Sequence, residues 1–315
     1  MQARFPLPAR WAGIFLPKKK LDKLKLVHRT TRAAGLAGDS AGSLAASAWG
    51  REVLTGWIGA DFWVEEGEGR DKNFGKKYYL CSPLKLRKKM NIGIIVAMDK
   101  ELSLLLPLIE DCRRTRCNDY EFYTGRLGRH EVTAMKCGIG KVNAAIGTLT
   151  LIDNFHPQLV INSGVAGGTG HGASILDVVV ATEVAYHDVW CGPGTIDGQA
   201  AGCPPRFACA ITPAMLESMD MADKVKSGLI ASGDIFVSRP DDITRILSLY
   251  PEAVAVDMES AAIAQVCYIK NVPFVCVRVV SDTPGAADNI AQYENFWEDA
   301  PRHTFETIKA IIAKI

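Results

Sequence analysis

The stretch VAVDMESAAIAQVCYIKNVPFVCVRVVSD, residues 254–282, decides the fold prediction. An apolar strand runs directly into two acids and a helical segment, and a second apolar strand then ends on Ser281 and Asp282. A buried strand that feeds a helix and then another strand is typical of an α/β domain. Ligands of such domains bind beyond the carboxyl ends of the strands, which is where these acids fall.

The flanking sequence repeats this alternation of strands and helices. The chain begins this alternation with a continuous apolar run. Two strand-forming segments, 120–127 and 130–137, follow with a short hairpin turn between them, and then a glycine turn opens a helix. We predict an α/β fold of three layers, αβα, around a central mixed sheet. The predicted strands are 91–97, 120–127, 130–137, 158–168, 176–188, 226–237, the start of 253–270 and 272–282; the predicted helices are 98–110, 138–155, the rest of 253–270 and the last 25 or so residues.

Charge divides the chain near Met90. Residues 1–89 carry 18 Lys and Arg against 8 Asp and Glu, about +10, whereas residues 90–315 carry 18 against 27, about −9. The basic run stops where the first buried-strand pattern starts. We therefore predict a basic N-terminal extension, residues 1–89, that is poorly ordered or non-essential, and a folded α/β domain over residues 90–315. A transit segment or a nucleic-acid arm are the other interpretations of the extension.

Cysteine usage and hydropathy indicate the compartment. The nine cysteines form no CxxC pair, and Cys137, Cys267 and Cys276 lie within apolar runs, as small core residues do. No apolar stretch approaches the length that spans a bilayer. We expect a cytoplasmic protein that binds neither membrane nor nucleic acid.

Two motifs that invite a nucleotide or metal assignment do not fit one. GIGKVN (138–143) has Asn143 where a dinucleotide fingerprint needs glycine, and Val142 where a phosphate loop needs Ser or Thr. In YHDVWC, His187 and Asp188 are neighbours on a strand and point to opposite faces, so they make a poor chelating pair. We predict no metal and no cofactor; a ligand-free tight turn stays an alternative for the glycine loops.

Three carboxylates follow three separate strands. Glu101 comes after the first strand, Glu259 opens the helix of the MES segment, and Asp282 ends the strand VRVVSD. Acids also favour the first turn of helices for electrostatic reasons alone. Hydrolysis of a glycosidic bond, however, needs one acid that protonates the leaving group and one base that activates water.

Seven pieces of the sequence, in order, resemble one family. They are IGIIVAMDKE, GIGKVNAA, INSGVAGG, YHD, SGDIFV, VAVDMESAAIAQVC and VPFVCVRVVSD. Together they resemble the 5'-methylthioadenosine/S-adenosylhomocysteine nucleosidases of the purine nucleoside phosphorylase and uridine phosphorylase superfamily, from Met90 to the C-terminus. The resemblance implies a nucleoside phosphorylase-like fold, a homodimer, and hydrolysis of an adenine nucleoside without cofactor.

The resemblance also implies a role for each matching residue. Asp282 resembles the acid that protonates adenine N7, with Ser281 orienting it, and Glu101 resembles the base that holds the water with Arg278 nearby. Glu259 resembles the group that binds the ribose hydroxyls. The other residues implied to bind substrate are Met98 and Met258 beside the ribose, Val165, Ala166 and Gly167 in the glycine loop, Phe236 and Val237 at the base, and Ile139 and Phe296 at the 5'-alkylthio tail.

Two departures and three alternatives accompany this prediction. Val165 stands where many relatives have serine, and the stretch VWCGPGTIDGQAAG (189–202) differs from relatives in a segment that reaches the tail pocket of the neighbouring subunit. Phosphorolysis is the nearest rival, but a carboxylate such as Glu101 repels a phosphate dianion and no arginine lies near it in sequence. A futalosine-type nucleoside is another candidate substrate. A non-catalytic binding protein of the same fold would be expected to lose the acids.

Overall fold

The computed structural model of this chain describes residues 89–299 and 301–315. The predicted extension therefore lies outside the described residues except for its last position, and its role stays a prediction. The described strands are β1 (Asn91–Val96), β2 (Glu110–Cys117), β3 (Tyr120–Leu127), β4 (His130–Lys136), β5 (Leu159–Gly168), β6 (Val178–Tyr186), β7 (Phe207–Ala208), β8 (Lys226–Ser232), β9 (Ala253–Asp257) and β10 (Phe274–Asp282). The described helices are α3 (Asp99–Leu105), the 3-10 helix η2 (Leu106–Leu108), α4 (Lys141–Phe155), α5 (Pro213–Ser218), α6 (Pro240–Leu249), α7 (Ser260–Lys270), α8 (Asn289–Asp299) and α9 (Pro301–Lys314).

The strands form one mixed sheet, as predicted. β1 lies parallel to both β4 and β5, β5 is parallel to β10, and β10 pairs with β6 in the antiparallel sense. β6, β8 and β9 are mutually parallel neighbours, and β9 returns to β5 through a short antiparallel pairing. The five strands β5, β10, β6, β8 and β9 thus close into a ring, while β1, β4, β3 and β2 extend from it as a sheet. The sequence does not predict this ring.

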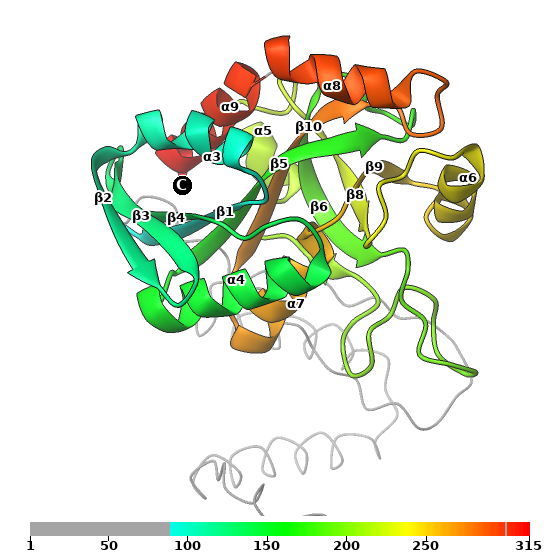
Figure 1. Ribbon diagram of the computed structural model, residues 1–315, viewed down its shortest axis with the longest axis horizontal. Coiled ribbons are helices and arrows are strands. Elements are labelled where there is room, and N and C mark those ends of the chain that lie inside the picture. The colour runs from blue at the N-terminus through cyan, green and yellow to red at the C-terminus, as the bar shows by residue number, and fades with distance from the viewer. Residues whose placement is uncertain (1–88, 300) are drawn as a thin grey trace, which may run out of the picture. The chain divides into compact units, whose positions relative to one another are not determined.

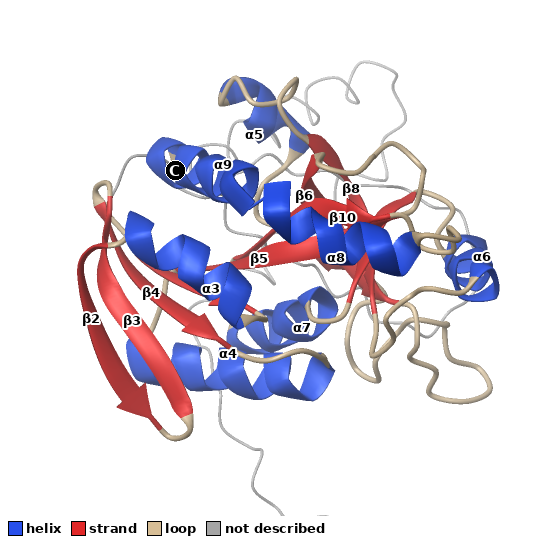
Figure 2. Ribbon diagram, turned by 45° about the horizontal axis from the view of Figure 1, so that its top comes forward, coloured by secondary structure: helices blue, strands red, loops and turns tan. Residues whose placement is uncertain are grey.

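Helices cover both faces of the sheet, which confirms the three-layer prediction (Figures 1 and 2). α4 and α7 pack side by side on one face, and α3, α8 and α9 lie on the other. Each face has its own apolar core: Leu105 and Ile308 belong to one cluster, and Leu151 and Ile263 to the second. Sheet strands such as β1 and β10 are buried on both sides, so they read as continuous apolar runs rather than as alternating ones.

Most predicted elements are confirmed, and three are wrong in extent. The strand predicted over 226–237 ends at Ser232, and residues 233–239 are irregular. The hairpin of β3 and β4 and the strand–helix–strand unit of β9, α7 and β10 lie where the sequence predicts them. The first predicted helix ends early because Pro107 follows α3 and cannot donate a helical hydrogen bond; the chain then enters η2 and the unpredicted edge strand β2. The single closing helix is two helices, α8 and α9, with Pro301 as the first residue of α9.

The topology brings four strand ends together. β1 leads into α3, β8 into an irregular segment 233–239, β9 into α7, and β10 ends at Asp282. The antiparallel pairing of Gly167 with Val256 places the last residues of β5 beside the end of β9. Within residues 89–299 and 301–315, no helix combines the length and the hydrophobicity needed to cross a membrane.

Candidate active site

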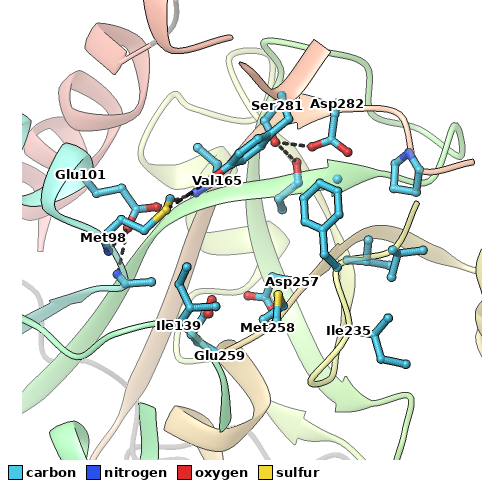
Figure 3. A pocket seen from close by; sticks show the side chains of 18 residues that line it. Met98, Glu101, Ile139, Val165, Ile235, Asp257, Met258, Glu259, Ser281 and Asp282 are labelled. Carbon is cyan, nitrogen blue, oxygen red and sulfur yellow. Dashed lines mark hydrogen bonds between the residues drawn. The ribbon is translucent and has the colours of Figure 1, made fainter. Parts of the chain in front are cut away.

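A cavity lies where these strand ends meet, with about 610 Å³ of space between its lining residues, part of it open to solvent. This size suits a small-molecule ligand. Twelve of the fourteen predicted site residues line it, and Figure 3 shows most of their side chains pointing into the same space. These twelve are Met98, Glu101, Ile139, Val165, Ala166, Gly167, Phe236, Val237, Met258, Glu259, Ser281 and Asp282.

Glu101 is buried in the first turn of α3 and is held by three backbone N–H groups. Its Oε2 accepts from Ala97 (2.8 Å) and Met98 (2.9 Å), and its Oε1 accepts from Val165 (3.1 Å). Gly164 makes room for it, because a Cβ there would come within 2.5 Å of Oε1. Burial raises the pKa of Glu101, while the positive charge of Arg278 and these N–H groups oppose the rise. The carboxylate is therefore fixed in position.

Arg278 lies beneath the cavity and does not line it. Its guanidinium donates from Nε (2.9 Å) and Nη2 (2.6 Å) to Oδ2 of Asp257, and from Nη2 to Oδ1 of Asn162 (2.6 Å). Glu259 Oε2 lies 3.8 Å from the same Nη2. The guanidinium is buried and paired, so it supplies a fixed positive charge under the acids. Sequence reasoning missed Asp257, although its place at the end of an apolar strand is the signal that singled out the other acids.

Glu259 joins the start of α7 to the glycine turn 138–140. It is the N-terminal cap residue of α7, and its Oε1 accepts the backbone N–H of Gly140 (3.0 Å). Burial, together with the neighbouring Asp257 carboxylate, raises the pKa of Glu259, and Arg278 opposes this rise. One oxygen of Glu259 is thus committed to the turn, and the residue still lines the cavity.

Asp282 lies at the end of β10 between two polar side chains. Ser281 Oγ hydrogen-bonds Asp282 Oδ1 and lies 3.2 Å from the carbonyl oxygen of Ala166 (Figure 3), and Asn289 Nδ2 donates to Asp282 Oδ2. A hydroxyl has one proton, so Ser281 can donate to both acceptors only in turn. A proton on Asp282 would satisfy the whole chain, with Asp282 donating to Ser281 and Ser281 to Ala166.

The pKa of Asp282 follows from the same surroundings. Burial raises the pKa of Asp282, and the hydrogen bonds from Ser281 and Asn289 oppose this rise. Asn289 is buried at the first residue of α8, and its Oδ1 has no hydrogen-bond partner within the described chain. Sequence reasoning missed Asn289, because nothing in the sequence shows that the chain turns back to Asp282 there.

An aromatic pair forms another side of the cavity. The rings of Phe236 and Tyr293 meet edge to face with centroids 5.5 Å apart, and the Tyr293 hydroxyl lies 3.4 Å from Met98 Sδ. Val237 is buried beside Phe236. Tyr293 was not among the predicted residues; its place in a polar helix, NIAQYENFWED, carries no signal for a binding site.

Phe296 differs from its prediction, because it does not line this cavity. It lies one turn further along α8 than Tyr293, is buried in the core that includes Ile308, and packs edge to face on Trp297 with ring centroids 5.5 Å apart. Asn289 and Tyr293 lie on the part of α8 that reaches Asp282 and the cavity, whereas Phe296, almost one turn further on, lies in the core. Tyr293 therefore occupies the wall that the sequence assigned to Phe296.

Four carboxylates line the cavity, and no lysine or arginine of the described chain does. Among the described residues, no group of three or more His, Cys, Asp and Glu is arranged to hold a metal ion. His187 and Asp188, the pair considered as metal ligands in the sequence, have other partners. Asp188 accepts from Lys141 (2.8 Å), and His187 is buried with its Nδ1 3.4 Å from Arg245. Burial raises the pKa values of three of these acids, Glu101, Glu259 and Asp282, and acids of this kind beside an apolar wall can exchange protons with a bound small molecule and a water molecule.

The sequence profile of the phosphorylase superfamily matches residues 91–313. The chain therefore belongs to that superfamily, whose architecture is the one described above. The 5'-methylthioadenosine/S-adenosylhomocysteine nucleosidase of Anoxybacillus flavithermus is 39% identical over 231 residues, which cover 72% of this chain and 99% of the relative. Within the superfamily, the chain belongs to the 5'-methylthioadenosine/S-adenosylhomocysteine nucleosidase family.

Solved structures agree with this assignment. The S-adenosylhomocysteine nucleosidase of Streptococcus pyogenes, in complex with 5-methylthiotubericidin, superposes with a TM-score of 0.67 at 36% identity and covers 71% of this chain and 96% of that chain. The futalosine hydrolase of Helicobacter pylori superposes with a TM-score of 0.65 at 27% identity and covers 71% of this chain and 98% of that one.

Proposed function

We propose that this chain hydrolyses the N-glycosidic bond of 5'-methylthioadenosine and S-adenosylhomocysteine and releases adenine and the 5'-thioribose product. The observation that carries this proposal is the gathering of Glu101, Glu259 and Asp282, from three strand ends, around one cavity. Bond cleavage needs an acid at the leaving base, a base at the attacking water, and stabilisation of the cation-like sugar between them.

Asp282 is the proposed general acid. It delivers a proton to N7 of adenine as the C1'–N9 bond breaks, so that the base leaves as a neutral molecule. An aspartic acid does this near neutral pH only when its pKa is raised, and the burial of Asp282 acts in that direction. Ser281 and Asn289 hold its two oxygens and thereby orient it.

Glu101 is the proposed general base. It accepts a proton from the water whose oxygen forms the new bond to C1'. Its three backbone donors leave the carboxylate little freedom to rotate, which preserves the alignment that catalysis needs. Arg278, anchored by Asp257, provides a positive charge that helps to keep Glu101 ionised.

The remaining residues are proposed to bind substrate. Glu259 accepts hydrogen bonds from the ribose hydroxyls, which strengthen as positive charge develops on the ring. Phe236 stacks on adenine and Val237 contacts its edge through the backbone. The other proposed contacts are Met98 and Met258 with the ribose, Val165, Ala166 and Gly167 along the glycine loop, Ile139 with the tail, and Tyr293 in the wall role predicted for Phe296.

Hydrolysis is favoured over phosphorolysis because of charge. A phosphate dianion in this cavity would face four carboxylates and no lysine or arginine from the described chain. The test incubates the purified protein with methylthioadenosine, S-adenosylhomocysteine, deoxyadenosine and a futalosine, each with and without phosphate, and measures the free base. Adenine release without phosphate is the expected result. Release that requires phosphate would assign a phosphorylase, and release from the futalosine alone would assign a futalosine hydrolase.

A homodimer in the cytoplasm is the expected working form, with a role in methionine salvage. α4 presents an exposed apolar row of Val142, Ile146 and Leu149, which are 67%, 50% and 42% exposed, beside the Ile139 wall of the cavity. Apolar rows of this kind on an otherwise polar surface mark interfaces. Light scattering of the purified protein tests this: a mass of two chains is expected, and Ile146→Glu should give one chain.

A further inference from the structure

Three segments around the cavity mouth meet in a cluster of charges that the proposed mechanism does not use. Lys141 is the first residue of α4, Asp188 follows β6, and Asp234 follows β8. Lys141 Nζ donates to Asp188 Oδ2 (2.8 Å) and lies 3.9 Å from Asp234 Oδ2. Asp188 Oδ2 also accepts the backbone N–H of Asp234 (2.9 Å). We refer to Lys141, Asp188 and Asp234 as the mouth cluster.

The mouth cluster also completes the start of α4. Gly140, at the N-terminal cap position, has no side chain to accept the first free N–H groups of the helix. Asp234 Oδ1 takes over that role from another segment and accepts the N–H of Lys141 (2.7 Å). A carboxylate at this end of a helix is favoured by the helix dipole as well. The segment after β8 is thereby attached to α4 through both the backbone and the side chain of Lys141.

The two segments joined in this way carry the exposed walls of the cavity. Ile139, in the turn before Lys141, is 50% exposed, and Phe236, two residues after Asp234, is 43% exposed. The segment 233–239 is neither helix nor strand; near its start, Gly233 donates its backbone N–H to Asp257 O and Ile235 donates to Gly233 O. Each segment also has an anchor of its own, Gly140 on Glu259 and Phe236 on Tyr293. The mouth cluster adds the contacts that join the two segments directly to each other.

The side chains of the mouth cluster are partly shielded from solvent, unlike those of an ion pair on the open surface. The side chains of Lys141 and Asp188 are 23% and 16% exposed, and the Lys141 ammonium lies 5.5 Å from the centre of the Tyr186 ring. Asp188 Oδ1 is buried without a partner among the described residues, so both contacts of that carboxylate fall on Oδ2. Burial favours protonation of Asp188, but the hydrogen bonds from Lys141 and from the Asp234 N–H hold its pKa below the usual range.

We propose that the mouth cluster is a positioning device: by tying the segment of Phe236 to the turn of Ile139, it sets the affinity for the adenine nucleoside without touching it. This inference rests on the proposed function for the identity of the ligand. Lys141 is the central member because it contacts both aspartates. Loss of Lys141 should widen the mouth and weaken binding, while Glu101 and Asp282, held by hydrogen bonds away from the mouth, keep their geometry.

The test compares Lys141→Met with Lys270→Met. Lys270, on α7, pairs with Asp153 of α4 (2.6 Å) and is 34% exposed. The control therefore removes a partly shielded ion pair whose α4 partner lies about 18 Å further along that helix than Lys141. We expect Lys141→Met to raise KM for methylthioadenosine, and Kd for adenine measured by calorimetry, about 10-fold, with kcat within about 2-fold of the wild type. Lys141→Arg, which keeps the charge, should restore most of the affinity.

Three results would overturn the proposal: KM and Kd of Lys141→Met equal to those of the wild type, a loss confined to kcat, or an equal loss of affinity in Lys270→Met. Should Lys141→Met not be recovered folded, Asp188→Asn takes its place, because an amide still accepts the Asp234 N–H but lacks the charge. A wild type that neither binds adenine nor cleaves the nucleoside would instead defeat the proposed function. An active wild type with an unchanged variant defeats this inference alone.

Discussion

The floor and the mouth of the cavity are built in opposite ways. On the floor, Glu101, Arg278 and Asp282 are at most 3% exposed and lie on or next to strands of the sheet. At the mouth, Ile139 and Phe236 are 50% and 43% exposed and lie on a turn and an irregular segment. Each floor residue has several direct hydrogen bonds, whereas the two segments that carry the mouth walls are joined to each other by a cluster of charges beside the walls. This difference separates chemistry from affinity: floor variants should lower kcat, and mouth variants should raise KM.

The largest expected effect comes from Asp282→Asn. The amide keeps the shape of the side chain but cannot donate the carboxylic proton, so kcat for methylthioadenosine should fall by about 10³-fold with little change in adenine affinity. Steady-state kinetics and calorimetry on the same preparation measure both quantities. A variant that keeps more than about a tenth of the wild-type kcat would remove Asp282 from the acid role.

The next effect is on stability. Arg278→Met leaves the buried Asp257 carboxylate without its partner and should lower the free energy of unfolding by about 3–5 kcal/mol in urea titrations. Arg126→Met is the control, since its pair with Asp111 (2.8 Å) joins side chains that are 55% and 70% exposed and should cost less than about 1 kcal/mol. Equal losses in both variants would show that the buried pair has no special part in holding the floor.

A moderate effect is expected in the pH profile of Asn289→Leu. The Asn289 amide donates to Asp282 and favours its ionised form, so its loss should raise the pKa of Asp282 further. Because the general acid works only when protonated, the alkaline limb of kcat should move up by about one pH unit. The control is Gln292→Leu, also on α8. Gln292 accepts the Thr283 N–H (2.8 Å), so its loss should leave the alkaline limb in place. A limb that moves down, or that moves equally in both variants, contradicts this assignment.

Stability against pH gives a related, smaller signal. The pKa of Asp282 is higher in the folded than in the unfolded chain, so its contribution to stability is present below the unfolded pKa and is lost as pH rises through the folded pKa. Asp282→Asn cannot titrate. The Tm of Asp282→Asn should therefore rise relative to the Tm of the wild type as pH increases from about 4, near the unfolded pKa of aspartate, through the folded pKa. A Tm difference that stays constant over this range would mean that Asp282 is not strained by burial.

The smallest effect belongs to the mouth. Phe236→Leu keeps an apolar side chain but loses ring stacking, so KM should rise by about 5-fold at constant kcat. Ile290→Ala alters another exposed apolar side chain, on α8, that does not line the cavity, and should leave KM unchanged. A fall in kcat for Phe236→Leu would remove the distinction between mouth and floor.

The floor was largely predictable from the sequence because its residues follow apolar strands. Glu101, Glu259 and Asp282 each come within a few residues of a strand end, and parallel strands bring such ends to one edge of a sheet. Asp257 ends its strand just as Asp282 does, so the same signal would have identified it. The ring closure of β5, β10, β6, β8 and β9 depends on pairings between strands far apart in sequence, for which a single chain carries no pattern.

The parts supplied by α8 were not predictable. The helix returns to the cavity through Asn289 and Tyr293, and the choice between Tyr293 and Phe296 as the wall depends on which turn of the helix faces β10. Both residues are aromatic and three positions apart, so helical periodicity does not separate them. The mouth cluster is similar: Lys141, Asp188 and Asp234 lie in three motifs of the sequence, but only the topology brings them together.

The most direct test of the central claim is a single turnover of methylthioadenosine in water enriched in oxygen-18, with phosphate present, followed by mass spectrometry of the sugar. We predict methylthioribose that carries the heavy oxygen at C1', because water activated by Glu101 forms the new bond. A methylthioribose 1-phosphate product, without heavy oxygen at C1', would contradict hydrolysis and with it the proposed roles of the cavity acids.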